Sequence, residues 1–315
     1  KLPGEDDLGP GSVIGCPLMI GDFDAVAIGT VTAREGDRIL AFGHSFFNKG
    51  KVSIPMSGGS IVTVMPLQTL SFKIGHQGDI LGSVQFDRGE GIAGVIGGSA
   101  DLFPVRISAR DISLGIEDEY NVEIAQVEEL APSLLISALG QAVGSVSGGS
   151  GELSVRYTIE GKFEDYDRPF SFGSMYYSGA GFFGMYPASA ILSLMSNPER
   201  EVRLSEVSAT LEILHERRSA MLEGFTMDKS TARPGDTVTA TLRLQTFDGG
   251  EIVREVKFRI PPDAAPGEYN VMVEGGQAVS GKPTMAEITS FDQMFEELMD
   301  WIPENAVIVS LVYPE

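Results

Sequence analysis

The fold is decided by residues 25–45, which read AVAIGTVTAREGDRILAFGHS. Apolar residues recur through residues 25–33, and the polar run 34–38 that follows contains Gly36, a residue typical of tight turns. A second apolar run then leads directly into Gly43-His44-Ser45. The pattern predicts a β-hairpin whose second strand ends at a histidine.

The remainder of the N-terminal part repeats this pattern of short strands. The 315 residues include 38 glycines and 17 prolines spread along the chain, which indicates many turns. Further strands are predicted at residues 12–20, 60–65, 69–74, 80–86, 91–96 and 103–108, with a turn at 75–79 around His76. Closely spaced strands with tight turns favour a small β-barrel in a mainly β protein.

Two short helices are predicted after this region. Residues 132–143 begin with Pro132, which suits a first helical turn, and carry apolar residues at helical spacing. A second apolar helix is expected at residues 188–196. Strand patterns return at residues 119–127, 153–163 and 205–214. We therefore predict a first domain over residues 1–223, which can divide into sub-barrels at 11–127 and 128–223.

The sequence changes character near residue 224. Alternating strands are predicted at residues 237–244, 252–260, 270–273 and 306–313. Ser290 and Gln293 form a capping box at the start of an apolar helical face. Strands separated by Pro-Gly turns at this spacing predict an immunoglobulin-like β-sandwich over residues 224–315, with a C-terminal helix and strand.

The charge balance argues against nucleic acid as a partner. The chain has 23 Lys+Arg and 44 Asp+Glu, a net charge of −21, so nucleic acid is not an expected partner. Cys16 is the single cysteine and permits no internal disulfide. No spacing of histidines, cysteines and carboxylates is typical of a metal site, and we predict no metal or cofactor.

Three stretches without charge are as long as a membrane span, namely residues 52–72, 130–151 and 169–198. Glycine, serine and proline interrupt each one, so we predict buried strands and short helices instead. Aromatic residues gather at 170–177 and 182–186. If exposed, they would mark a partner site or a membrane-surface site; core packing is the alternative.

His44 has the sequence position that best suits catalysis. A histidine held at the end of a strand can act as a general base, although a structural role is the alternative. His215 lies in a polar stretch and is expected to be exposed.

The residues around His44 resemble those of SpoIVB-type serine peptidases. Residues 27–32 (AIGTVT) and 39–44 (ILAFGH) look like the Gly-Thr strand and the Gly-His element of that family. Residues 87–94 (DRGEGIAG) look like its Gly-Ile-Phe-Gly strand, and the resemblance covers residues 11–127. Bacterial SpoIVB-peptidase-domain proteins are also similar at residues 43–50 (GHSFFNKG) and 233–238 (RPGDTV).

The resemblance implies a chymotrypsin-like arrangement in an exported bacterial protein, with His44 as the catalytic histidine. The nucleophile motif of the family, Gly-Met-Ser-Gly-Ser-Pro, is absent. Two fragments of the chain are partly similar to this motif. Ser57 lies in PMSGGS, and Ser147 lies in GSVSGGS, where the glycines would help to form an oxyanion hole. The acid of a triad could be Asp79, Asp87 or Asp101.

Two functions follow from these residues. The first is an exported, non-catalytic relative of the peptidases that binds a protein or peptide partner or serves as a scaffold. The second is an active serine endopeptidase with His44 as the base and Ser147, or less favoured Ser57, as the nucleophile. The surroundings of His44 distinguish the two, because a base must reach its nucleophile by a hydrogen bond.

Overall fold

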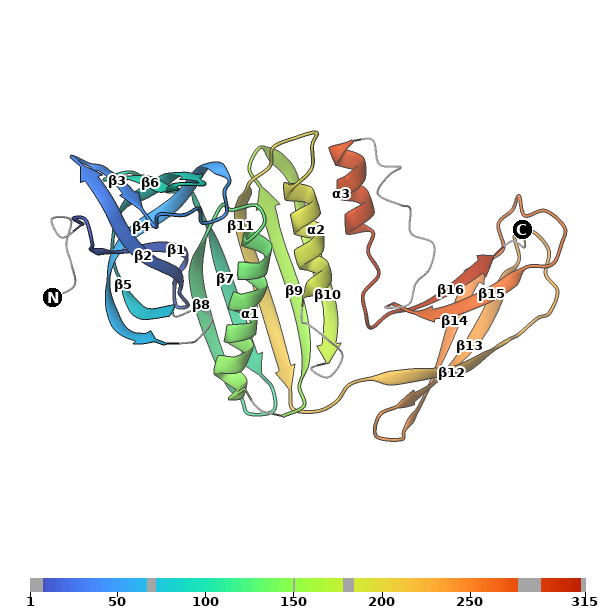
Figure 1. The fold of residues 1–315 in the computed structure, drawn as a ribbon. Helices are drawn as coiled ribbons and strands as arrows, with labels where there is room; N and C mark the ends of the chain where they lie inside the picture. Colours follow the sequence, from blue (N-terminus) through green and yellow to red (C-terminus); the bar gives the residue numbers. More distant parts are fainter. Residues whose placement is uncertain (1–7, 67–71, 150, 178–183, 277–289, 313–315) are drawn as a thin grey trace.

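The computed structural model describes residues 8–66, 72–149, 151–177, 184–276 and 290–312. The prediction of a mainly β protein is confirmed, because the described residues form an eleven-stranded sheet and two smaller sheets with only three helices. Figure 1 shows three parts in a row: a curled group of strands at the N-terminal end, a sheet covered by helices, and the C-terminal strands.

The first six strands close into a barrel. They are β1 (Val13–Gly21), β2 (Ala25–Glu35), β3 (Arg38–Ala41), β4 (Gly50–Met65), β5 (Phe72–Arg88) and β6 (Gly91–Ile96). Their order is β1-β2-β3-β6-β5-β4, and β4 returns to β1 where Ser57 pairs with Gly15. Buried apolar side chains fill the interior, Ile14, Ile54 and Val84 among them. Closure removes the unpaired edges that an open sheet would have.

The β4–β5 hairpin is longer than the sequence predicts. The predicted turn at 75–79 is wrong, because β5 runs through it without a break and His76 pairs with Ser60. The glycines there permit close approach of two backbones instead of a turn. A Cβ on Gly75 would lie 2.4 Å from the carbonyl oxygen of Ser60.

The sheet continues beyond the barrel into a flatter central part. Its strands are β7 (Leu102–Asp111), β8 (Ile116–Ala125), β9 (Ser154–Phe163), β10 (Tyr166–Tyr177) and β11 (Leu204–Leu214). Their order is β10-β9-β11-β7-β8, and β8 pairs with β1. Helices α1 (Ala131–Ser147) and α2 (Met185–Met195) cover one face (Figure 1). Residues 128–223 therefore contribute to an open sheet with helices and do not close a second ring.

The aromatic segment that we considered as a surface patch lies partly in the core. Phe170 and Phe172 are fully buried between the central sheet and its helices. Phe182 and Phe183 lie outside the described residues. Within the described part of the chain, no helix is long and apolar enough to cross a membrane.

The C-terminal strands form two small sheets. One contains β12 (Ala220–Met227), β13 (Thr237–Thr246) and β14 (Glu251–Arg259), and the other contains β15 (Asn270–Gly275) and β16 (Val307–Val312). Helix α3 (Phe291–Met299) lies between β15 and β16 in sequence, and the Ser290 hydroxyl accepts its first capping hydrogen bond from the Gln293 N–H.

Helix α3 packs on the central sheet, away from the strands that precede and follow it. Its buried residues Phe291, Met294 and Phe295 belong to the core of the central sheet. The Tyr166 hydroxyl donates to the Asp292 carboxylate at 2.9 Å, on the same face of the helix. The C-terminal strands are therefore tied to the central sheet twice, through the segment after β11 and through α3.

Substitution of Phe295 by alanine tests this second attachment. Removal of a buried ring should lower the free energy of unfolding by about 3 kcal/mol. The matched control is Glu297→Ala on the same helix, which should change it by less than about 0.5 kcal/mol. Chemical denaturation of the full chain measures both. Equal effects would contradict the packing of α3 described here.

Candidate functional site around His44

The loop that carries His44 leaves β3 through two residues in the left-handed conformation. Phe42 has φ 71° and Gly43 has φ 74°, and the former is uncommon for a residue with a side chain. The Phe42 N–H donates to the carbonyl of Thr30 at 3.0 Å. The Phe42 ring lies against Gly29, where a Cβ would be 2.2 Å from the ring. Gly29 and Thr30 thus hold the start of the loop.

A buried carboxylate fixes the next part of the loop. Asp87, near the end of β5, is 0% exposed, and its two oxygens accept the N–H groups of Phe46 and Phe47 at 2.7 and 2.5 Å. Among the three acids considered for a triad, Asp79 is exposed and Asp101 pairs with Arg203 at the surface. Asp87 therefore holds the backbone of the loop, and both of its oxygens are engaged there.

His44 itself is exposed. Its Nδ1 lies 2.7 Å from the carbonyl oxygen of Ser45, so Nδ1 must donate and Nε2 is the free acceptor of the neutral ring. This is the only hydrogen bond of the His44 ring within the described residues. A general base needs such an accessible nitrogen, but it also needs a group from which to take a proton.

Ser57 does not provide that group. It lies in β4, is fully buried, and its hydroxyl has no hydrogen-bond partner among the described residues. The hydroxyl fills the space beside Gly15 of β1, where a Cβ would lie 2.3 Å from the Ser57 oxygen. The PMSGGS fragment is therefore part of the seam where the barrel closes.

Ser147 is also bonded elsewhere. The predicted helix extends four residues beyond Val143, so that Ser147 occupies its last turn and donates to the Val143 carbonyl at 2.7 Å. The helix ends at Gly148, which adopts the left-handed conformation that often terminates helices. Neither candidate serine hydrogen-bonds to the His44 ring.

A second histidine has a carboxylate partner that the sequence analysis did not find. His215 Nε2 lies 2.6 Å from the buried Asp111, whose other oxygen accepts the Leu114 N–H at 2.7 Å. His215 follows β11 and Asp111 ends β7, and the parallel pairing of these strands brings the two residues together. They are 104 residues apart in sequence, so no local sequence pattern indicates the pair. His215 is exposed, as predicted.

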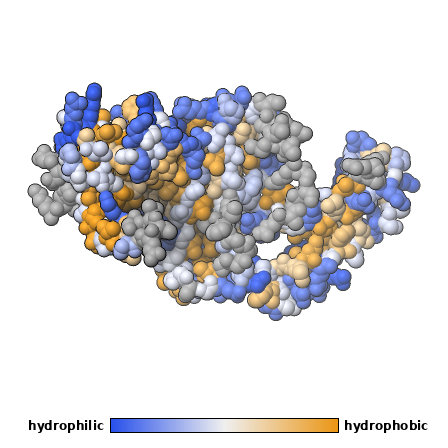
Figure 2. Space-filling view, in the orientation of Figure 1, coloured by the Kyte–Doolittle hydropathy of each residue, from blue (hydrophilic) through white to orange (hydrophobic). Residues whose placement is uncertain are grey.

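A hairpin near the His44 loop exposes apolar side chains on both of its faces. We call residues 60–65 and 72–80 the β4–β5 arm. Six of its large apolar side chains are 42–59% exposed: Val62, Val64, Met65, Phe72, Ile74 and Ile80. The Lys73 ammonium donates to the Thr30 hydroxyl at 2.9 Å, so Thr30 contacts both the arm and the start of the His44 loop. Figure 2 shows hydrophobic residues gathered at the barrel end of the molecule.

The single cysteine is not a reactive nucleophile. Burial raises the pKa of the Cys16 thiol to about 12, and the nearby charge of Asp87 acts in the same direction. The thiol is therefore protonated and inert at neutral pH. No group of three potential metal ligands occurs within the described ranges.

Comparison of the chain with protein-family models, with curated proteins and with solved structures finds no match in any of the three. The resemblance to SpoIVB-type peptidases accordingly stays a prediction from the sequence.

Replacement of Asp87 by asparagine tests the loop anchor. The amide keeps one acceptor oxygen but loses the charge and the second acceptor, so the Phe46 and Phe47 amides should exchange with solvent at least about tenfold faster. Asp79→Asn, on the same strand but exposed, should leave both rates unchanged. Hydrogen exchange followed by NMR measures the amides individually. Unchanged rates in Asp87→Asn would contradict the role assigned to this carboxylate.

Proposed function

We propose that the chain is an exported, non-catalytic relative of SpoIVB-type peptidases that binds a protein or peptide partner through the β4–β5 arm. Export follows from the resemblance alone. The observation that carries the non-catalytic part is the environment of His44: an accessible ring nitrogen to which no serine hydroxyl of the described residues is hydrogen-bonded.

The arrangement of strands supports the resemblance. A closed ring in the order β1-β2-β3-β6-β5-β4 suits a chymotrypsin-like barrel, and His44 follows β3 at one end of it. The two small sheets after residue 219 suit an immunoglobulin-like module. The strands and two helices of the central sheet were expected from the sequence, but as a second sub-barrel and not as an open sheet covered by helices.

The state of the other triad positions also favours binding over cleavage. In a serine peptidase the acid orients the histidine ring, whereas both oxygens of Asp87 are occupied by backbone N–H groups. The hydroxyl of Ser57 is enclosed in the barrel seam and that of Ser147 is bonded within α1. A peptidase would need to rearrange a closed barrel or a helix to present either one.

The β4–β5 arm supplies the surface for a partner. Its apolar side chains project from a hairpin that extends past the shorter strands β3 and β6. Large apolar side chains exposed on one element are suited to contact a partner. A partner seated on the arm would lie next to the His44 loop, which Thr30 joins to the arm.

Labelling with a fluorophosphonate probe tests the absence of catalysis. We expect no labelling of the full chain, because in the part that the structure describes no serine hydroxyl is hydrogen-bonded to His44. A known serine peptidase in the same reaction serves as the positive control. Labelling that disappears in His44→Ala would establish an active serine and overturn this part of the proposal.

Photo-cross-linking tests the binding surface. A photoreactive amino acid in place of Ile74, in the cells that produce the protein, should give one discrete cross-linked protein. The same amino acid in place of Glu119, an exposed residue of β8, is the matched control and should give none. Equal cross-linking from both positions, or none from Ile74, would contradict the assignment of the arm.

A further inference from the structure

A large cleft separates the C-terminal strands from the edge of the central sheet. Its volume is about 1160 Å³, above the usual range of about 300–1,000 Å³ for small-molecule pockets. In Figure 2 the molecule is hollowed between these two parts. The size favours a segment of polypeptide over a small metabolite. The cleft is separate from the β4–β5 arm, which lies on the barrel.

One wall of the cleft is a face of the three-stranded sheet. Leu242 pairs with Arg254 and Leu244 pairs with Ile252 across β13 and β14, and paired residues lie on the same face. All four line the cleft, together with Leu222 of β12. Among the described residues, Gly275 of β15 and Val307 of β16 also line the cleft. This face of the sheet is therefore largely apolar and carries one cation, Arg254. Elsewhere the cleft is also lined by acidic residues, namely Glu216, Asp248, Glu255 and Glu304.

That cation has no anionic partner. Within the described residues, the Arg254 guanidinium makes a single hydrogen bond, to the carbonyl of Val253, and no ion pair. The other cations of the cleft are engaged: Arg218 pairs with Glu216 at 2.5 Å, and Arg217 lies between two aromatic rings. An unpaired arginine beside apolar side chains, in a chain of net charge −21, is suited to bind a carboxylate.

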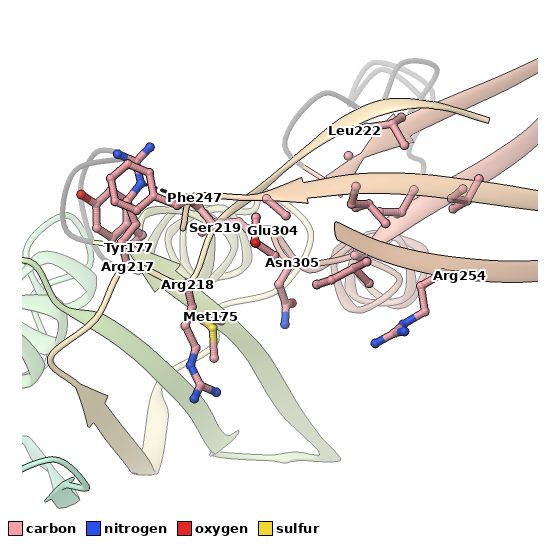
Figure 3. Close-up of a pocket in the computed structure, with 18 of the residues that line it drawn as sticks. Met175, Tyr177, Arg217, Arg218, Ser219, Leu222, Phe247, Arg254, Glu304 and Asn305 are labelled. Carbon is pink, nitrogen blue, oxygen red and sulfur yellow. Dashed lines mark hydrogen bonds between the residues drawn. The ribbon is translucent and has the colours of Figure 1, made fainter. Parts of the chain in front are cut away.

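Polar groups near Arg254 suit a peptide backbone. In Figure 3, Asn305 and the two arginines Arg218 and Arg254 point toward the same side of the cleft. The Asn305 side chain is exposed and has no hydrogen-bond partner among the described residues. An amide offers both a donor and an acceptor, which matches the peptide group of an extended chain.

The walls of the cleft are held in place before any ligand binds. The Arg217 guanidinium lies 4.7 Å from the Tyr177 ring of β10 and 4.0 Å from the Phe247 ring after β13. On the other side, the Glu304 N–H donates to the Ser174 hydroxyl at 3.1 Å. These contacts lie near both connections of the C-terminal strands to the central sheet, and they hold the walls of the cleft in place. A site that is already ordered lowers the entropic cost of binding.

We propose that this cleft binds an extended peptide segment with apolar side chains at alternate positions and a carboxylate that pairs with Arg254. In an extended segment alternate side chains point to the same side, so the apolar ones can pack together on the apolar face of the sheet. The carboxylate supplies the anionic partner that Arg254 lacks. Asn305 contacts the peptide backbone.

Fluorescence anisotropy with synthetic peptides tests the proposal on the full chain. The probe is a fluorescein-labelled peptide of about six residues, the usual length of a strand, with alternating valine and threonine and a central glutamate. We expect it to bind the wild-type chain, and Arg254→Glu to weaken binding at least about tenfold. A peptide with lysine in place of the glutamate should show the reverse preference and bind Arg254→Glu more tightly than the wild type.

Arg243→Glu is the matched control. Arg243 is exposed on the neighbouring strand and pairs with Val253, so it lies on the opposite face of the sheet. It carries the same change of charge but should leave the affinity for the glutamate peptide unchanged. Failure of the wild type to bind this peptide, or equal losses in Arg254→Glu and Arg243→Glu, would overturn the proposal.

Discussion

Strand β1 is the constraint on which the rest of the structure depends, because it hydrogen-bonds to three other strands. It pairs with β2 along most of its length, with β4 at Gly15, and with β8 at its end, from Met19 to Gly21. The first part of β1 therefore closes the barrel, and the last part begins the central sheet. The absence of a side chain at Gly15 leaves room for the Ser57 hydroxyl at the point of closure.

The same seam accounts for the small residues of the serine fragment that lies near His44 in sequence. PMSGGS has small residues because two strands approach closely there, and a packing requirement produced a sequence similar to a catalytic motif. GSVSGGS is similar for another reason, namely a helix that ends in glycine. Small residues serve tight backbone geometry in both cases, and their spacing alone does not separate that use from an oxyanion hole.

Local patterns predicted the elements well and their partners poorly. Pro132 marked the start of α1 and Ser290 the cap of α3, because helix ends depend on a few adjacent residues. The Asp111–His215 pair depends on β11 lying beside β7, and the docking of α3 depends on a core formed by distant strands. At the candidate site the sequence indicated His44 and included Asp87 among three acids. It could not show that Asp87 binds backbone amides, since that contact requires the closed barrel.

The position of β11 also determines the order in which the chain can fold. In the sheet β11 lies between β9 and β7, although it follows both of them in sequence. Until β11 is available, the hairpin of β9 and β10 cannot join the sheet that contains β7 and the barrel. Contacts over such long separations in sequence slow folding. The edge of β7 therefore stays unpaired during synthesis until residue 214 has emerged from the ribosome, and this interval is when the chain is most exposed to mispairing with other strands.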